Sequence, residues 1–365
     1  MRYEIGTLPF SELLLPVARA GDALARLDDR IGQSPLRNGW IERSHFADAC
    51  ASLYLDGGLV HLEDLVLHDA HMDIRSPTHE LVTAHAVLRA RRQILGNDPG
   101  WALGNQGLAM LRGRNGNLAS APERKDLAGL HPEAPLEAID ADDIFGAELA
   151  AIDAVLARSQ AALDGAVLPP RSSERDLAIY DEDWDEDDRL GEWRKLARES
   201  DSLPPVLRAA LLLDAWSVLD VLQHSPWLGR LLVAAMLRDC GATSAHLLAV
   251  NTGLRDIRWE RRRARDRKTR LIALLEAIEQ AGRIGLRDHD RLMGAQQLLQ
   301  RKLAGRRSNS RLPQLIDLVL SRPLVSAGMI ARELKITQQG AVGLAEDLGL
   351  REMTGRGRFR AWGVL

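Results

Sequence analysis

The sequence has few cysteines and no long apolar run, and both absences exclude classes of protein. Cys50 and Cys240 are the only cysteines among 365 residues, too few for a disulfide framework and without paired metal-ligand spacing. We expect two buried free thiols, no metal and no cofactor. No window holds eighteen uninterrupted apolar residues, and the N-terminus lacks the basic start and cleavage site of a signal peptide. We therefore expect a cytoplasmic protein with no membrane span.

A strong net charge is also lacking. Lys and Arg number 48 and Asp and Glu number 51, which gives a formal net charge of -3. A protein that coats nucleic acid would be basic throughout, so any DNA contact must come from a local basic region.

Strand-like runs are nearly absent, and apolar residues recur mostly every three or four positions. This spacing predicts an all-α fold, with helices at 10–31, 41–55, 62–72, 141–163, 206–223 and 228–239, and one opening at Ser76-Pro77. Residues 113–135 are expected to be a loop. Residues 169–188 look like an exposed connection that ends in an acidic run. We expect an N-terminal helical region at 1–100, a helical core with a long acidic loop at 101–305, and a terminal domain at 306–365.

The terminal domain has the pattern of a helix-turn-helix. Leu312, Ile316, Val319 and Leu320 form a first apolar stripe. Ser326 can cap a second helix through Leu334, and Thr337 can cap a third, with the short turn Lys335-Ile336 between them. After Leu350 the period changes to two, with a hairpin tip at residues 354–357. The pattern predicts a winged helix-turn-helix.

The terminal domain fits duplex DNA. The N-terminal side chains of a recognition helix reach base edges in the major groove, and here they are Thr337, Gln338 and Gln339. The hairpin arginines would meet phosphates or the minor groove; they are Arg356, Arg358 and Arg360. Two features argue against strong binding. Gly340 and Gly343 weaken the recognition helix, and the acidic pair Glu346-Asp347 would repel phosphates. The alternative is a winged helix used for protein contact.

The segment from Pro204 to Gly241 resembles the core of the Fic (adenylyl-transferring) fold. In that family a buried helix leads into the loop H-P-F-x-[D/E]-G-N-G-R. Here His224, Gly229 and Arg230 match, but the acidic residue and the Gly-Asn-Gly do not. The resemblance implies a general-base histidine, an acidic residue for magnesium and a glycine-rich phosphate turn. With two of these parts missing, we expect no adenylyl transfer and a structural role for His224.

A second stretch resembles the inhibitory helix motif of many Fic proteins, S-x-x-x-E-[G/N]. It comprises Ser52, Asp56 and Gly57, with aspartate in place of the expected glutamate. Many Fic proteins also carry a winged-helix tail. The whole pattern resembles, in addition, a bacterial family that pairs a domain of unknown function with a terminal helix-turn-helix.

Two other clusters have plainer interpretations. The basic run 258–270 is typical of a solvated helix face, with nucleic-acid contact as the alternative. The histidines between His61 and His85 lack a clear third ligand, so they favour hydrogen-bonded or solvent-facing roles over a metal site.

Together these features predict a transcriptional regulator that binds double-stranded DNA as a homodimer. Its catalytically degenerate Fic-like body would serve dimerisation or partner contact. Two alternatives remain open: a residual Fic-type nucleotidyltransferase or nucleotide sensor, and a protein–protein adaptor in a toxin–antitoxin or plasmid-maintenance system.

Overall fold

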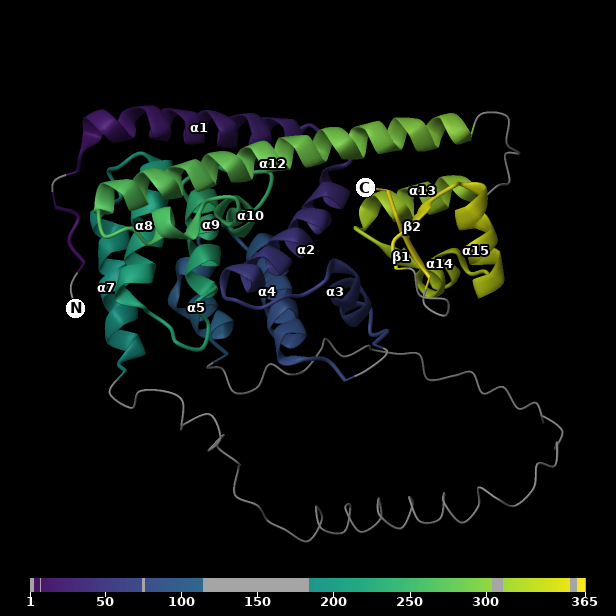
Figure 1. Cartoon of the computed structure of the whole chain (residues 1–365), viewed down its shortest axis with the longest axis horizontal. Helices are drawn as coiled ribbons and strands as arrows, with labels where there is room; N and C mark the ends of the chain where they lie inside the picture. Colours follow the sequence, from purple (N-terminus) through teal and green to yellow (C-terminus); the bar gives the residue numbers. More distant parts are fainter. Residues whose placement is uncertain are drawn as a thin grey trace, which may run out of the picture. The chain divides into compact units, whose positions relative to one another are not determined.

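The computed structural model describes residues 3–6, 8–73, 76–113, 184–303, 311–354 and 360–364. Apart from Trp184, these residues belong to one compact unit. Helices dominate it, as the apolar spacing predicted, and the chain has a helical body followed by a terminal domain (Figure 1). We call the elements from α1 to α12 the body.

The body contains the following elements: α1 (Phe10–Gly32), α2 (Arg37–Leu55), α3 (Leu62–Asp69), α4 (His79–Gly96), the 3-10 helix η1 (Trp101–Leu103), α5 (Asn105–Leu111), α7 (Glu186–Glu199), α8 (Pro205–Leu219), α9 (Leu228–Asp239), α10 (Val250–Arg255), α11 (Trp259–Arg262) and α12 (Arg267–Lys302). The terminal domain contains α13 (Leu312–Ser321), β1 (Val325–Ser326), α14 (Ala327–Leu334), α15 (Gln338–Asp347), β2 (Arg351–Glu352) and β3 (Ala361–Gly363).

The two long helices α1 and α12 lie side by side (Figure 1). Glycine permits the close approach, because a Cβ on Gly282 would lie 3.0 Å from the carbonyl oxygen of Ala23. One turn further on, a Cβ on Gly285 would lie 2.8 Å from the Leu27 side chain. The carbonyl of Gly285 accepts a hydrogen bond of 3.0 Å from the indole of Trp40, which joins α2 to this pair.

Helix α8 is buried on nearly every side, as its continuous apolar sequence predicted. Helix α9 spans the predicted 228–239, and α8 packs against it. These two helices form the centre of the body.

Some predicted boundaries are wrong, for identifiable physical reasons. Helix α7 begins inside the acidic run that we expected to be part of a connection. The carboxylate of Asp185 accepts from the backbone N–H of Asp188, and three acidic residues in the first turn favour a helix N-terminus. Helix α4 is capped by Thr78, whose hydroxyl accepts from Leu81, and not by Ser76. The predicted helix 141–163 lies outside the described residues.

Both cysteines are free thiols, as expected, but neither is fully buried, so the expected burial is wrong. Cys50 is half-buried, and Cys240 is exposed just after the end of α9. Within the described ranges, no helix combines the length and apolarity that crossing a bilayer requires.

A buried ion pair joins three parts of the body. Arg91 of α4 and Asp48 of α2 have no exposed side-chain surface and lie in direct contact. Arg91 also donates to the carbonyl oxygens of Leu247 at 3.0 Å and Leu248 at 3.3 Å, and to Nδ1 of His45. Burial and the neighbouring guanidinium hold the pKa of His45 well below its usual value, so its ring stays neutral and can accept.

The Asp48 carboxylate meets the start of α10. It accepts from the backbone N–H of Asn251 at 2.8 Å, from the Asn251 amide at 2.8 Å and from the backbone N–H of Thr252 at 3.2 Å. Every oxygen of the carboxylate is therefore satisfied, which a buried charge requires.

Replacing Asp48 with Ala is expected to lower the free energy of unfolding by about 3–5 kcal/mol, because Arg91 would remain buried without its counter-charge. Urea denaturation measures the change. The matched control is Asp22→Ala, which removes an exposed carboxylate paired with Arg26 on α1 and should change stability little. Equal effects of the two substitutions would contradict the role of the buried pair.

Candidate nucleic-acid interface

The terminal domain is a helix-turn-helix built on α14 and α15. The Ser326 hydroxyl accepts from the backbone N–H of Met329 at 3.2 Å, and the Thr337 hydroxyl accepts from that of Gly340 at 3.1 Å. Both predicted N-caps are confirmed. Between the helices, Lys335 adopts a left-handed conformation with φ 52°, which reverses the chain within the predicted short turn.

The predicted stripe of α13 is buried and forms the core of the terminal domain with residues of α14, α15 and β3. The buried side chains include Leu312, Leu315, Ile316, Val319, Leu320, Met329, Ile330, Leu334, Ala341, Ala345, Leu348 and Trp362. This core fixes the angle between α14 and α15, which pack together directly.

The N-terminal end of α15 faces solvent. Thr337, Gln338 and Gln339 are all exposed, as are Gly340 and Gly343 further along the helix. A Cβ added at Gly343 would meet no atom within 4 Å. This face therefore presents two side-chain amides next to two glycines that add no side chain. Side-chain amides are groups that can bond a base edge.

A three-stranded antiparallel sheet, in the order β1-β3-β2, closes the terminal domain. Strand β2 pairs with β3 through Glu352 and Trp362, and the backbone N–H of Met353 donates to the carbonyl of Ala361 at 2.8 Å. The change to period two predicted this hairpin. The sequence did not indicate β1, because a two-residue strand shows no period and depends on pairing with β3.

At the base of the hairpin, Arg360 forms two ion pairs. Its guanidinium donates to Glu352 at 2.9 Å and to Glu346 of α15 at 3.0 Å, and lies over the Trp362 ring. These carboxylates raise the pKa of Arg360. Arg360 therefore joins the hairpin to α15, and Glu346 carries a paired charge. Arg356 and Arg358 lie outside the described residues.

Two cationic side chains of the body bind the C-terminal ends of helices in the terminal domain. Arg43 of α2 donates to the carbonyl oxygen of Val319 at 2.6 Å and to that of Leu320 at 3.5 Å, at the end of α13. Lys302 at the end of α12 donates to the carbonyl of Leu348 at 2.6 Å, just after α15. Both positions carry unpaired carbonyls and the negative end of a helix dipole.

The contact between α2 and α13 is close. A Cβ on Gly39 would lie 2.3 Å from the Leu320 carbonyl oxygen, so only glycine fits. Burial lowers the pKa of Arg43 to about 10, which leaves the guanidinium charged at neutral pH. Met72, after α3, packs on the start of α14, where its methyl carbon lies 2.8 Å from the position of a Cβ on Gly328.

The structure also brings together the two sequence motifs that resemble Fic proteins. Arg230 of α9 donates to both oxygens of Asp56, at 3.0 and 2.7 Å, and to the Ser52 hydroxyl at 2.9 Å. Gly57 follows with φ 88°, a conformation that favours glycine, just past the end of α2. Arg230, which follows the loop that resembles the Fic motif, is thus bound by the end of α2.

The other matched loop residues make packing or surface contacts. A Cβ on Gly229 would lie 2.1 Å from the Trp216 ring, so Gly229 lets α9 approach α8. His224 is 63% exposed, and its Nδ1 lies 3.3 Å from a Glu186 oxygen at the start of α7. His224 and Arg230 are therefore held by different helices.

The remaining clusters mostly make internal contacts. In the basic run, Arg261 pairs with Glu276 and Arg270 pairs with Asp214, while Arg267 donates to the Ile5 carbonyl at 2.7 Å. Among the histidines, His68 bonds Asp73 and His85 bonds Asp69. In the part of the chain that the structure describes, no three His, Cys, Asp or Glu side chains could hold a metal ion.

Two family models match parts of the chain. Residues 178–304 match a family model described as a protein of unknown function (DUF1612), and residues 312–365 match one described as an HTH DNA binding domain. The uncharacterized protein y4cF from Sinorhizobium fredii is 50% identical over 380 residues, with 100% of each chain covered.

A solved structure is similar to the whole chain. It is the crystal structure of a Fic family protein from Desulfovibrio desulfuricans, with a TM-score of 0.50 and 12% identity, covering 99% of this chain and 98% of that one. At this identity the likeness shows the fold alone. The Fic-like fold and the helix-turn-helix expected from the sequence are both confirmed.

Replacing Gly229 with Ala is expected to lower the free energy of unfolding by about 1–3 kcal/mol, because the methyl group would collide with Trp216. The control is Gly191→Ala on α7, where a Cβ meets nothing within 4 Å and helix propensity favours alanine by about 0.5–1 kcal/mol. Thermal and urea unfolding measure both variants. A stable Gly229→Ala variant would contradict the packing role.

Proposed function

The chain belongs to the family of the uncharacterized protein y4cF, and we propose that it is a transcriptional regulator that binds duplex DNA in the cytoplasm. The observation that carries the proposal is the N-terminal end of α15, which is exposed, bears two glutamine amides and belongs to an HTH DNA-binding domain. Nothing in the described body covers Gln338 and Gln339, so a double helix has access to them.

In this proposal the terminal domain acts as a winged helix. Helix α15 enters the major groove, where Gln338 and Gln339 offer amides that can bond adenine in two places. Arg356 and Arg358 contact phosphates or the minor groove from the hairpin tip. Arg360 stays at the hairpin base, where its bonds to Glu346 and Glu352 hold the hairpin against α15.

We also propose that the protein acts as a homodimer, because dimers bind the two halves of a symmetric operator. The body, comprising the N-terminal region 1–100 and the core 101–305, would supply dimer or partner contacts. Light scattering at micromolar concentration is expected to give twice the chain mass, and a strict monomer would remove this part of the proposal.

A residual nucleotidyltransferase or nucleotide sensor is less well supported. Fic proteins use the loop arginine to neutralise nucleotide phosphates, whereas in this chain both terminal nitrogens of Arg230 bond Asp56. A phosphate would have to displace that carboxylate. Calorimetric binding of ATP with magnesium that depends on Arg230 would favour this alternative, and a co-purifying stoichiometric partner without any DNA footprint would favour a protein–protein adaptor.

Replacing both Arg356 and Arg358 with Ala is expected to weaken binding to all duplexes alike. Each lost phosphate contact should flatten the slope of log affinity against log salt by about 0.9. Fluorescence anisotropy at salt concentrations from about 50 to 200 mM measures this slope. Arg26→Ala, on the exposed surface of α1, is the control. No duplex binding by the native chain at low salt would defeat the proposal.

Replacing Gln338 or Gln339 with Ala is expected to change sequence preference rather than general affinity. A bidentate contact to one adenine is worth about 1–3 kcal/mol of discrimination against other bases. Selection from a random duplex pool, before and after substitution, measures the preference at each position. An unchanged preference in both variants would show that α15 does not read bases through these amides.

A further inference from the structure

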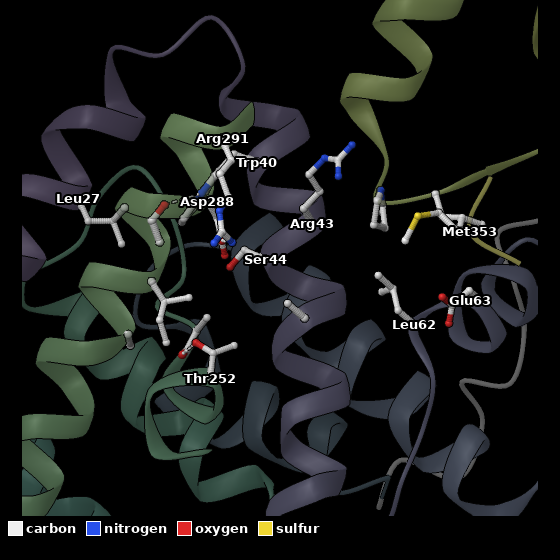
Figure 2. A pocket seen from close by; sticks show the side chains of 17 residues that line it. Leu27, Trp40, Arg43, Ser44, Leu62, Glu63, Thr252, Asp288, Arg291 and Met353 are labelled. Atoms are coloured by element: carbon white, nitrogen blue, oxygen red, sulfur yellow. Dashed lines mark hydrogen bonds and ion pairs between the residues drawn. The ribbon is translucent and has the colours of Figure 1, made fainter. Parts of the chain in front are cut away.

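A cavity of about 210 Å³ lies where the body meets the terminal domain. Figure 2 shows the side chains that line it, among them Trp40, Arg43 and Ser44 from α2, Asp288 and Arg291 from α12, and Met353 from the terminal domain. An engineered apolar cavity of roughly 150 Å³ holds benzene. This cavity therefore has room for a molecule of one or two rings.

The lining is mainly apolar and carries no net formal charge. Trp40, Leu62, Leu324 and Met353 supply apolar surface. The charged residues that line it are two cationic side chains, Arg43 and Arg291, and two acidic ones, Glu63 and Asp288, with Arg291 lying 3.4 Å from Asp288. A neutral ligand matches this balance better than an anion or a cation, whose charge would need a counter-charge in a partly closed site.

One polar group in the lining lacks a partner. The Ser44 hydroxyl oxygen is buried, and no hydrogen-bond partner for it exists among the described residues. Buried hydroxyl groups in folded proteins are nearly always bonded. Because Ser44 lines the cavity, rotation about its Cα–Cβ bond would turn this hydroxyl toward a ligand hydroxyl or carbonyl. The resulting hydrogen bond would satisfy it and would fix the ligand's orientation.

One residue that lines the cavity, Arg43, also holds the terminal domain on the body. Arg43 lines the cavity and also bonds the carbonyl oxygens at the end of α13. Pro323 and Leu324 follow α13 directly, and Met353 follows β2 at the hairpin base. A molecule in the cavity would therefore contact both sides of the joint that sets the position of α15.

We propose that this cavity is an effector site for a small, neutral, mainly aromatic molecule bearing one hydroxyl or carbonyl group, and that its occupancy changes the affinity of the terminal domain for DNA. The site itself does not depend on the proposed function, whereas the coupling to DNA rests on it. Coupling between two sites is reciprocal, so DNA must change the effector's affinity by the same factor.

The first experiment tests the site in the full chain without DNA. Naphthalene, 2-naphthol and the charged compound 2-naphthoate are titrated by calorimetry and followed by the thermal unfolding midpoint. We expect 2-naphthol to bind best and to raise the midpoint. Ser44→Ala is expected to remove the advantage of 2-naphthol over naphthalene, because the two compounds differ only in the hydroxyl group.

Ala47→Phe provides a variant that fills the cavity. Ala47 is an exposed residue of α2 that lines the cavity, so a larger side chain there can enter the space without disturbing the core. It is expected to weaken 2-naphthol at least tenfold, whereas Ala25→Phe, at an exposed position of α1, should bind as the native chain does. No binding of 2-naphthol at millimolar concentration, or equal binding of 2-naphthol by the Ala47→Phe variant, overturns the site.

The second experiment tests coupling with a duplex selected from a random pool by the full chain. Saturating 2-naphthol is expected to change the affinity for this duplex about 5–150-fold in the native chain, within the usual range of allosteric coupling, and to have no effect in Ala47→Phe. Binding of 2-naphthol with an unchanged DNA affinity overturns the coupling. A third outcome separates the two proposals. If the native chain binds 2-naphthol, the Ala47→Phe variant does not, and the native chain selects no duplex, the site is supported and the DNA-binding function is refuted.

Discussion

The buried pair of Asp48 and Arg91 is the constraint on which the rest of the structure depends. It fixes α2 against α4 and against the start of α10. Burying either charge alone would carry a large desolvation cost, so each charge requires the other. Helix α2 is thereby placed in the middle of the body. Ser44, Asp48, Ser52 and Asp56 follow one another at intervals of four, so they lie along one side of this helix. Along that side, Ser44 lines the cavity, Asp48 belongs to the buried pair, and Ser52 and Asp56 bind Arg230.

The adjoining side of α2 contacts the terminal domain. Gly39 and Arg43 meet the end of α13, and Lys302 of α12 meets the end of α15. Both cations bind unpaired carbonyls at the negative ends of helices, so the body positions the helix-turn-helix through helix termini and leaves the exposed face of α15 open. The helix that is fixed by the buried pair is thus also the helix that orients the DNA-binding domain.

The Fic-like fold of the body is held together by packing contacts that include the loop residues matched in the sequence analysis. In the family that the loop resembles, the arginine and the glycines serve nucleotide phosphates. In this chain Arg230 bonds Asp56 and Ser52, and Gly229 accommodates the Trp216 ring. These contacts stabilise the packing of α2, α8 and α9. The packing of buried helices defines the fold, and it requires apolar surfaces and close approach, not the chemistry of the loop.

The sequence by itself determined the features that depend on neighbouring residues: the helices with apolar spacing, the caps Ser326 and Thr337, the turn at Lys335 and the hairpin after Leu350. It also indicated two motifs, Ser52 with Asp56 and the loop ending at Arg230, but not that they meet 174 residues apart in the chain. Only the tertiary structure decided that meeting, the pairing of Arg360 with Glu346, the burial of Arg91 and the cavity at Ser44. The physical reason is the range of the interactions. Hydrogen bonds within a turn and apolar periodicity depend on residues close together in the chain. Long-range ion pairs and cavities form only when helices distant in the sequence pack together.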